Sequence, residues 1–452
     1  MMNIIALLQR IQPEITKTNL KRLSRIVEAM LSINGRITML SLSRWAGKGG
    51  SYRTIQRFFN TTIAWPKMHK AIFEHHLYDP GKEYFLVGDE CVITKSGHKT
   101  YGLDIFFSGL LSRVTKSIAI FTLSLVDVNE RRATPMRVKQ VVRSQAEKEA
   151  AKAKKKEKKA KKASAKGGKK AGRPKGSRNR DKTKVTLTAE LQRIQKMVQK
   201  QLSCLPTGIQ VKHLALDGHF GNNNALQMVR QCGLYLISKL RHDAALYFLY
   251  DGRQKKKGPR KKYGDKIDYR HIPQKYLVNT HIEGDIKTCI YQAKMLHRDF
   301  AQSLNVVFIT KTNLKTGAVA NVNLFSSDLS LAYEKIIDYY RLRFQIEFNF
   351  RDAKQVWGLE DFMNVNQVPL TNALNLSLFM VTVSQVLLQQ FRQTRPESGV
   401  LDLKAYFRAA KYVDETIKLL PEKPEPILLN QIFAQVASLG CIHSVNVQCS
   451  SP

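Results

Sequence analysis

Apolar residues near the start of the chain recur at helical spacing. Within residues 20–31 they lie three or four positions apart, and Gly35 ends the run. Residues 37–60 hold two shorter apolar segments, which the glycines of residues 47–50 separate. The pattern predicts a helical region over residues 1–80.

Residues 37–60 are typical of a helix-turn-helix. Ser51 is placed to cap the second helix, and Arg53, Gln56 and Arg57 would lie on its exposed face. Polar side chains of this kind read base edges when such a helix enters the major groove of DNA. The same pattern also fits a helical hairpin with a solvated basic face, so both interpretations stay open.

The chain after residue 83 is rich in apolar runs of strand length. Strands are predicted at 84–89, 101–107, 117–128, 211–216, 234–240, 276–280, 287–293, 305–311 and 321–326. Helices are predicted at 186–203 and 329–356. Residues 373–388 are strongly apolar but shorter than the roughly 20 residues of a membrane span, which predicts a buried core helix. The fold class is therefore α/β.

The composition indicates an intracellular protein with a polyanionic partner. The 452 residues hold 74 Lys and Arg against 36 Asp and Glu, a net charge of +38, which favours nucleic acid. The six cysteines form no CxxC pair and the chain begins without a secretory signal, as expected in a reducing compartment. We expect a cytoplasmic, nucleoid-associated protein with no membrane partner.

Much of this charge lies in one segment. Residues 143–184 hold 19 Lys and Arg and only 4 Asp and Glu, with few apolar residues to bury, so we expect a disordered insertion or a frayed helix. Inside it, residues 172–176, Gly-Arg-Pro-Lys-Gly, resemble an AT-hook core, in which Arg173 and Lys175 enter an A·T minor groove. A nonspecific cationic tether is the alternative.

Two carboxylates follow apolar strands. Asp89 ends the run at 84–89, and Asp217 follows the run at 211–216. An ionised carboxylate at such a buried position needs a compensating cation, and a divalent metal ion is the usual one where no Lys or Arg adjoins. Each Asp could instead cap a following helix, so metal binding and capping are both open.

A third acid lies in a helical stripe within residues 339–362. At about 100° per residue, four side chains fall within roughly 60° of one another: Tyr340, Arg343, Glu347 and Lys354. A separate face is apolar and would pack on a sheet: Leu342, Ile346, Phe350, Ala353, Val356 and Trp357. A simple ion pair between Arg343 and Glu347 at i,i+4 is the alternative to a functional stripe.

The spacing Y-x2-R-x3-E-x6-K of these residues matches the signature of bacterial insertion-sequence transposases of the DDE superfamily. The resemblance covers roughly residues 10–390, and residues 217–222, Asp-Gly-His-Phe-Gly-Asn, look like the second-Asp motif of that family. It implies a ribonuclease-H-like mixed sheet with flanking helices, a helical N-terminal DNA-binding domain, and a strand-rich insertion between Asp217 and Glu347.

The resemblance also implies the chemistry. Asp89, Asp217 and Glu347 would hold two Mg²⁺ or Mn²⁺ ions for DNA cleavage and strand transfer, and the other three residues of the signature would clamp the DNA backbone. The implied partners are double-stranded DNA, at the element ends and at the target, and a second copy of the chain in the DNA complex. GKGG at residues 47–50 lacks the Walker spacing, so no nucleotide is expected.

Together these patterns divide the chain into five expected regions. They are a helical DNA-binding domain (1–80), a catalytic domain (81–145, 186–240 and 301–392), a basic insertion (146–185), a strand-rich insertion (241–300) and a C-terminal helical region (393–452). Some relatives stack a flipped base on a Trp of the insertion. Residues 240–300 contain no Trp, so a DNA hairpin intermediate stays open, with Tyr263, Tyr269 or Tyr276 as alternative stacking rings.

Two other functions also stay open. One is an inactive or domesticated DNA-binding or architectural protein that keeps the fold, which the loss of any of the three acids would favour; all three are present. The other is a nuclease that only hydrolyses nucleic acid. The long basic segments and the four-residue stripe favour a transposase over it.

Overall fold

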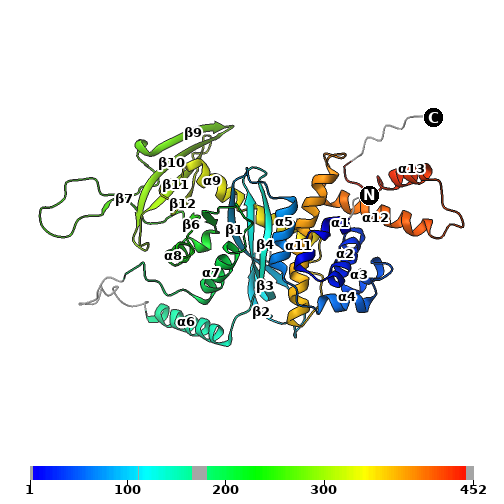
Figure 1. The fold of residues 1–452 in the computed structure, drawn as a ribbon. Helices are drawn as coiled ribbons and strands as arrows, with labels where there is room; N and C mark the ends of the chain where they lie inside the picture. Colours follow the sequence, from blue (N-terminus) through cyan, green and yellow to red (C-terminus); the bar gives the residue numbers. More distant parts are fainter. Residues whose placement is uncertain (1–3, 110, 165–180, 444–452) are drawn as a thin grey trace.

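The described part of the chain is a mixed α/β protein with a large sheet at its centre (Figure 1). The structure is a computed structural model and describes residues 4–109, 111–164 and 181–443. The strands of the sheet are β1 (Tyr84–Thr94), β2 (Asp104–Ser108), β3 (Arg113–Asp127), β4 (Arg132–Val141), β5 (His213–Ala215), β6 (Tyr235–Leu240), β7 (Leu246–Leu249), β8 (Tyr263–Lys266), β9 (Leu277–Glu283), β10 (Ile286–His297), β11 (Leu304–Asn313) and β12 (Val319–Ser326). Their order is β2-β3-β1-β5-β6-β12-β11-β10-β7-β8, with β4 beside β3 and β9 beside β10.

Strands β1, β5 and β6 form the middle of this sheet. β1 pairs antiparallel with β3 along all eleven of its residues, and on its other side it runs parallel to β5, which runs parallel to β6. Helix α7 (Ala189–Leu202) precedes β5, and helix α8 (Asn223–Gln231) connects β5 to β6. Parallel strands are covered on both faces, which explains why these strands are nearly continuous apolar runs.

Strands β7 to β12 extend the same sheet. β12 pairs antiparallel with β6, and β11, β10 and β7 follow in that order. The strands predicted at 276–280 and 287–293 are confirmed by β9 and β10, and β8 adds a strand that was not predicted. The strand-rich segment therefore belongs to one hydrogen-bonded sheet with β1 and β5.

Five helices precede the sheet and confirm the helical prediction for the start of the chain. They are α1 (Ile4–Gln9), α2 (Lys17–Ser32), α3 (Met39–Trp45), α4 (Tyr52–Phe59) and α5 (Trp65–His76), with a 3₁₀ turn at Gln12–Glu14. The Ser51 side chain accepts the Thr54 N–H at the start of α4, as expected of a cap. Gly47 and Gly49 have positive φ angles of 65° and 85° in the turn between α3 and α4, where residues with a Cβ are disfavoured.

One apolar helix, α11 (Gln367–Phe391), packs against α5, β4 and α12 (Val400–Ile417). By length and composition α11 could cross a membrane, yet 89% of its most apolar window is buried inside the protein. Trp65 Nε1 donates to Asn372 Oδ1 at 2.8 Å, which satisfies a polar group within this packing. The prediction of a buried core helix is confirmed.

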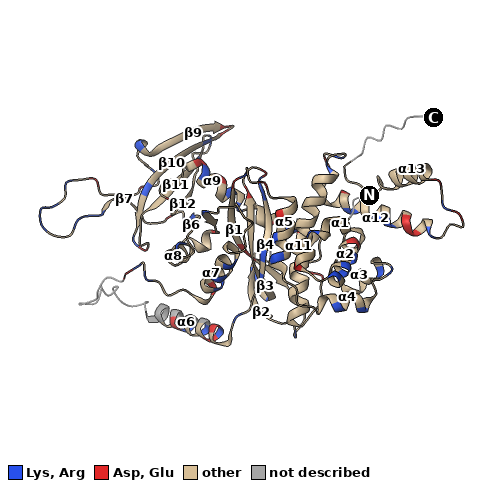
Figure 2. Cartoon of the chain, viewed as in Figure 1, with Lys and Arg blue, Asp and Glu red and all other residues tan. Residues whose placement is uncertain are grey.

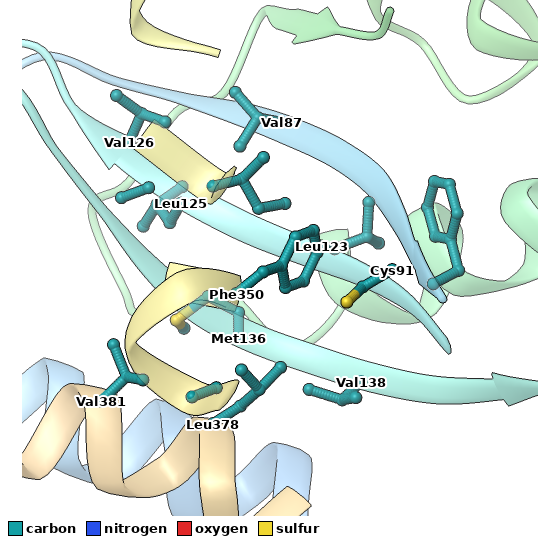
Figure 3. Close-up of a cluster of buried hydrophobic side chains, with 14 of the residues drawn as sticks. Val87, Cys91, Leu123, Leu125, Val126, Met136, Val138, Phe350, Leu378 and Val381 are labelled. Atoms are coloured by element: carbon teal, nitrogen blue, oxygen red, sulfur yellow. The ribbon is translucent and has the colours of Figure 1, made fainter. Parts of the chain in front are cut away.

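The core continues from α11 into the sheet. Figure 3 shows Leu378 and Val381 of α11 beside Met136 of β4, with Phe350 next to them. All four side chains are buried, so sheet, core helix and the helix that carries Phe350 share one apolar interior. Burial of this kind stabilises the fold by about 25 cal/mol per Å² of apolar surface.

The basic segment begins with a helix, α6 (Gln145–Ser164). Its first turn is fixed to the rest of the protein, because Glu147 pairs with Arg193 of α7 (2.5 Å) and Lys148 with Asp104 of β2 (3.5 Å). The sequence predicted either a disordered insertion or a frayed helix in this segment, and the structure shows a helix as far as residue 164.

The segment after β12 forms two helices, α9 (Tyr333–Leu342) and α10 (Gln345–Gln355). The prediction of one continuous helix over 329–356 was wrong. The Phe344 and Glu347 N–H groups bond to carbonyls three residues earlier, a 3₁₀-type tightening that interrupts the α-helical pattern. The predicted apolar face is nevertheless buried, apart from the half-buried Val356.

The remaining elements are short or C-terminal. Helix α13 (Pro426–Val436) follows α12, and 3₁₀ turns lie at Gly218–Phe220 and Gln274–Tyr276.

Candidate active site

Asp89 lies in the middle of β1 and not at its end. The strand continues to Thr94, with Cys91 and Ile93 buried and the ladder to β3 unbroken. The prediction that Asp89 ends the strand was therefore wrong. A Cβ at the preceding Gly88 would lie only 2.9 Å from the Phe121 ring, so close packing of β3 on β1 requires glycine beside this acid.

Asp217 lies beside Asp89, because the two acids follow paired residues of neighbouring strands. Val87 of β1 lies opposite Ala215 of β5 in a parallel ladder, and each acid follows two residues later in the same direction along the sheet. The Asp217 carboxylate also accepts the His219 N–H at 3.2 Å. Asp217 thus caps the 3₁₀ turn at Gly218–Phe220, whereas Asn222 caps the following helix α8, so the capping alternative holds only for the turn. The partly exposed carboxylate still lies beside β1.

Arg343 connects two of the acids, because its guanidinium contacts both. Its Nη1 lies 2.8 Å from Asp89 Oδ2, and its Nη2 lies 3.2 Å from Glu347 Oε1. The i,i+4 ion pair foreseen from the sequence is present, but the shorter contact is to Asp89, 254 residues away. The same guanidinium lies 5.5 Å from the centre of the Tyr340 ring, so three residues of the stripe gather at β1.

Burial raises the pKa of Asp89 from 3.8 to about 6. The Arg343 cation opposes this rise, whereas the Asp217 and Glu347 carboxylates add to it. Burial lowers the pKa of Arg343, but Asp89 and its other anionic neighbours outweigh burial and raise that pKa above its ordinary value. Asp217 and Glu347 are thus close enough to Asp89 to raise its pKa, and all three carboxylates lie near the Arg343 cation.

The donor set suits a divalent cation in its chemistry. Asp89, Asp217 and Glu347 offer carboxylate oxygens, the ligands that Mg²⁺ and Mn²⁺ prefer, and a partly buried acid with a raised pKa needs a compensating charge. In the described ranges no three His, Cys, Asp or Glu side chains stand close enough together to hold an ion. The Arg343 guanidinium supplies the charge there instead, so a bound ion would have to displace it.

Two lysines join α10 and the loop after it to β1. Lys354 Nζ donates to the Val92 carbonyl (2.9 Å) and pairs with Glu360 (2.9 Å). Lys95 Nζ donates to the Glu360 carbonyl (3.0 Å), and sequence reasoning missed this residue. Lys95 directly follows β1, six positions after Asp89, and the strand period of two, continued by one residue, was the signal that could have placed it on the face of Asp89.

The opposite face of β1 borders a cleft of about 980 Å³. Glu90, Arg143, Arg193 and His219 are among its lining residues, so the cations of Arg143 and Arg193 lie near Glu90, on the face of β1 opposite Asp89. Sequence analysis missed these residues, because they come from separate elements and form no local motif.

The other candidate DNA contacts lie outside this cluster. Arg53 and Arg57 are exposed on α4, and Gln56 is half-buried and accepts a hydrogen bond from Arg53 (3.0 Å). Figure 2 shows Lys and Arg on α2, α4 and α6. Arg173 and Lys175 of the AT-hook-like segment lie outside the described residues.

The three insertion tyrosines already have partners within the protein. The contacts are Tyr263 with the Tyr247 ring (5.4 Å), Tyr276 stacked on Phe248 (4.8 Å), and Tyr269 O–H donating to the Ala244 carbonyl (2.7 Å). Their use as base-stacking rings therefore stays a prediction.

Residues 10–291 match a protein family described as DDE superfamily endonuclease. The chain belongs to this family. The match covers more than half of the chain and includes Asp89 and Asp217, whereas Glu347 lies beyond its end. No curated protein matches the chain. Membership gives this DDE endonuclease a ribonuclease-H-like architecture and implies nuclease activity, which in DDE enzymes generally uses divalent metals.

Proposed function

We propose that this DDE endonuclease is the transposase of a bacterial insertion sequence. It binds the terminal inverted repeats of its own element, cleaves DNA at the element ends, and joins the freed 3′ ends to target DNA. One observation carries the proposal: the Arg343 guanidinium contacts both Asp89 and Glu347. Asp217 lies beside Asp89, because each of these two acids comes two residues after the pair Val87–Ala215.

The three acids would hold two Mg²⁺ or Mn²⁺ ions. When bound, such a pair activates water and stabilises charge on the leaving 3′ oxygen. Asp89 pairs with Thr122 of β3 and lies two residues after the last pair of β1 with β5, so its position in the sheet suits the role of the ligand shared by both ions. Asp217 and Glu347 would each complete one ion's shell.

The remaining residues of the stripe would bind the DNA backbone. Arg343 and Lys354 are now neutralised by Asp89, Glu347 and Glu360, and DNA phosphates compete for the same cations. Tyr340 is partly buried beside Arg343, which suits it to orient that side chain. Contacts of this kind position DNA and carry no sequence information.

Sequence reading would come from elsewhere in the chain. The exposed face of α4 with Arg53, Gln56 and Arg57 supports major-groove binding at the repeats. The basic segment, with Arg173 and Lys175, adds affinity for any DNA. We infer a cytoplasmic, nucleoid-associated protein that acts on double-stranded DNA as a pair of copies.

A direct test uses the purified full chain with Mg²⁺ and linear DNA that carries the element's own ends. Nicks at the ends and joined products are expected. Asp89→Asn, Asp217→Asn and Glu347→Gln should each abolish cleavage while end binding persists. Glu334→Gln, an exposed acid on α9, is the matched control and should keep activity.

The possible outcomes separate the competing functions. Cleavage without joined products would favour a hydrolysis-only nuclease. Binding without cleavage in the unmodified chain would favour an inactive architectural protein. Cleavage within about tenfold of the unmodified chain in any of the three acid variants would remove that residue from the site.

A further inference from the structure

The loop that follows α10 contacts two parts of the protein that are far apart in sequence, the strand β1 and the helical region before the sheet. It comprises residues 356–364, between the helix that carries Glu347 and the core helix α11, and we call it the α10 loop. Its apolar side chains Trp357, Leu359 and Phe362 are buried. The loop is therefore packed into the fold and does not lie loosely on its surface.

On one side the α10 loop is joined to β1. Lys95, directly after this strand, donates from Nζ to the carbonyls of Glu360 (3.0 Å) and Phe362 (2.9 Å) and lies 3.7 Å from the centre of the Phe362 ring. Lys354 of α10 pairs with Glu360 (2.9 Å) and donates to the Val92 carbonyl of β1 (2.9 Å). These contacts hold the loop in a defined position relative to the strand of the first acid.

On the other side the α10 loop is joined to the residues directly before α3. Asp361 Oδ2 accepts the Ile37 N–H at 3.0 Å, and Asp361 Oδ1 lies 4.0 Å from Arg36 Nε. Thr38, the next residue, is the N-cap of α3. Gly358 has a φ of 70°, and a Cβ there would lie only 2.6 Å from Ile37 Cβ. A residue other than glycine would therefore push the loop and α3 apart.

The contact between the α10 loop and α3 is closely packed. The space left between them is about 20 Å³, and its lining includes Ile37, Leu42, Trp357, Gly358 and Phe362. This volume holds about one water molecule. Close-packed interiors transmit a displacement and absorb little of it, so a movement of α3 would move the loop as well.

Other contacts hold the helical region to the core helices. Asn372 of α11 donates to the Phe59 carbonyl (2.7 Å), and Arg408 of α12 donates to the Ser32 carbonyl (3.1 Å). Figure 1 shows α2, α3 and α4 grouped beside α11. Loss of the Asp361 side chain should therefore leave the helical region docked and change mainly its alignment with β1 and α10.

We propose that Asp361 is a positioning residue that fixes which phosphodiester bond is cut, because it holds α3 and α4 at a set distance from Asp89 and Glu347. The inference deepens the proposed function and rests on it, since α4 must bind the element end at one fixed sequence. One base pair spans about 3.4 Å of duplex, so a shift of that size between α4 and the acids would move the cut by one position.

The test maps the cut at single-nucleotide resolution on labelled DNA that carries the element end, with the full chain and Mg²⁺. Asp361→Ala should bind this DNA within about twofold of the unmodified chain, cut the correct bond at least about tenfold more slowly, and cut neighbouring bonds as well. Asp361→Asn keeps an oxygen that can accept the Ile37 N–H, so it should restore most of the rate and the correct position.

Two further variants complete this experiment. Gly358→Ala separates the loop from α3 by its added Cβ and should displace the cut in the same way as Asp361→Ala. Asp338→Ala is the matched control, because it removes an acid of α9 whose partner Arg131 (2.8 Å) lies between β3 and β4. It should cut at the unmodified position.

Hydrogen exchange tests the joint without metal or cleavage. The Ile37 amide should exchange at least about tenfold faster in Asp361→Ala, because its hydrogen bond is lost. Binding of the element end should slow exchange in residues 358–364 of the unmodified chain and leave these residues unaffected in the variant. A chain that binds ends and never cuts would refute the proposed function alone, and the exchange data would then decide whether the joint transmits DNA binding.

Three results would overturn the inference. The first is an unchanged cut position and rate in both Asp361→Ala and Gly358→Ala. The second is the same displacement of the cut in Asp338→Ala, which would indicate a general loss of stability. The third is an Ile37 amide that exchanges equally fast with and without the Asp361 carboxylate.

Discussion

Arg343 Nη1 lies 2.8 Å from Asp89 Oδ2, so the first acid of the candidate site already has a cation as its partner. The same guanidinium reaches Glu347 at 3.2 Å, and its buried Nε has no hydrogen-bond partner among the described residues. One side chain therefore occupies the position from which divalent ions would neutralise two acids. Binding of divalent ions to these acids would therefore require the release of Arg343.

Arg343→Ala should destabilise the metal-free protein by about 3 kcal/mol, because it leaves the partly buried Asp89 without its counter-charge. Mn²⁺ should then restore more stability to the variant than to the unmodified chain, since no ion pair has to break. Thermal unfolding with and without Mn²⁺ measures both effects. Arg351→Ala is the control, as its side chain is 54% exposed against 11% for Arg343. Equal losses in the two variants would refute the prediction.

The raised pKa of Asp89 predicts a pH-dependent stability. Its folded pKa of about 6 exceeds the ordinary 3.8, so ionisation costs stability, which falls as pH rises from about 4 to about 6 and stays low above that. The difference in unfolding free energy between the metal-free chain and Asp89→Asn should therefore change by up to about 3 kcal/mol across this range. Denaturant titrations at several pH values measure it. A constant difference would show that Asp89 does not titrate there.

Removal of residues 153–180 should leave the protein folded, because the contacts of Glu147 and Lys148 lie before the deletion. The segment holds 14 Lys and Arg, so DNA affinity should fall and its salt dependence should flatten. Binding isotherms at several salt concentrations measure both. A Gly-Ser segment of equal length serves as the control for linker length and should behave like the deletion. An insoluble protein, or an unchanged salt slope, would contradict this role.

Lys354→Ala and Glu347→Gln should affect different steps. Loss of Lys354 removes a phosphate partner, so binding of precleaved ends should weaken and its salt slope should flatten by about 0.9. Glu347→Gln should keep end affinity and lose cleavage. If the stripe were only a set of ion pairs, both variants would lose a little melting temperature with unchanged affinity. Isotherms beside thermal melts distinguish the two cases.

Sequence periodicity located most of the fold, because burial decides where apolar residues recur. It found the strand that carries Asp89 and the strand that leads to Asp217. It also predicted a buried core helix over residues 373–388, although α11 has 25 residues and is longer than expected. It failed at the interruption between α9 and α10, because residues 339–349 contain no Gly or Pro to mark a break. On the two sides of this turn the helices pack on different elements, α9 on β6, β11 and β12, and α10 on β1, β4 and α11.

The sequence predicted which residues form the candidate site, but not which of them contact one another. The sequence spacing selected Tyr340, Arg343, Glu347 and Lys354. It predicted only Glu347 as an ion-pair partner of Arg343. Its shorter contact joins Asp89 across 254 residues, which only the assembled sheet brings about. Lys95 was missed for a related reason, because its partners are carbonyls of a distant loop.

The three-residue strand β5 makes the sheet mechanically uneven. β1 and β3 pair over eleven positions, whereas β5 pairs with β1 at two and with β6 at three. A torque applied by DNA to the two halves of the sheet meets the fewest backbone hydrogen bonds at β5. A load on the two halves of the sheet would therefore be expected to twist it first at the strand that leads directly to Asp217, and so to change the spacing between Asp89 and Asp217.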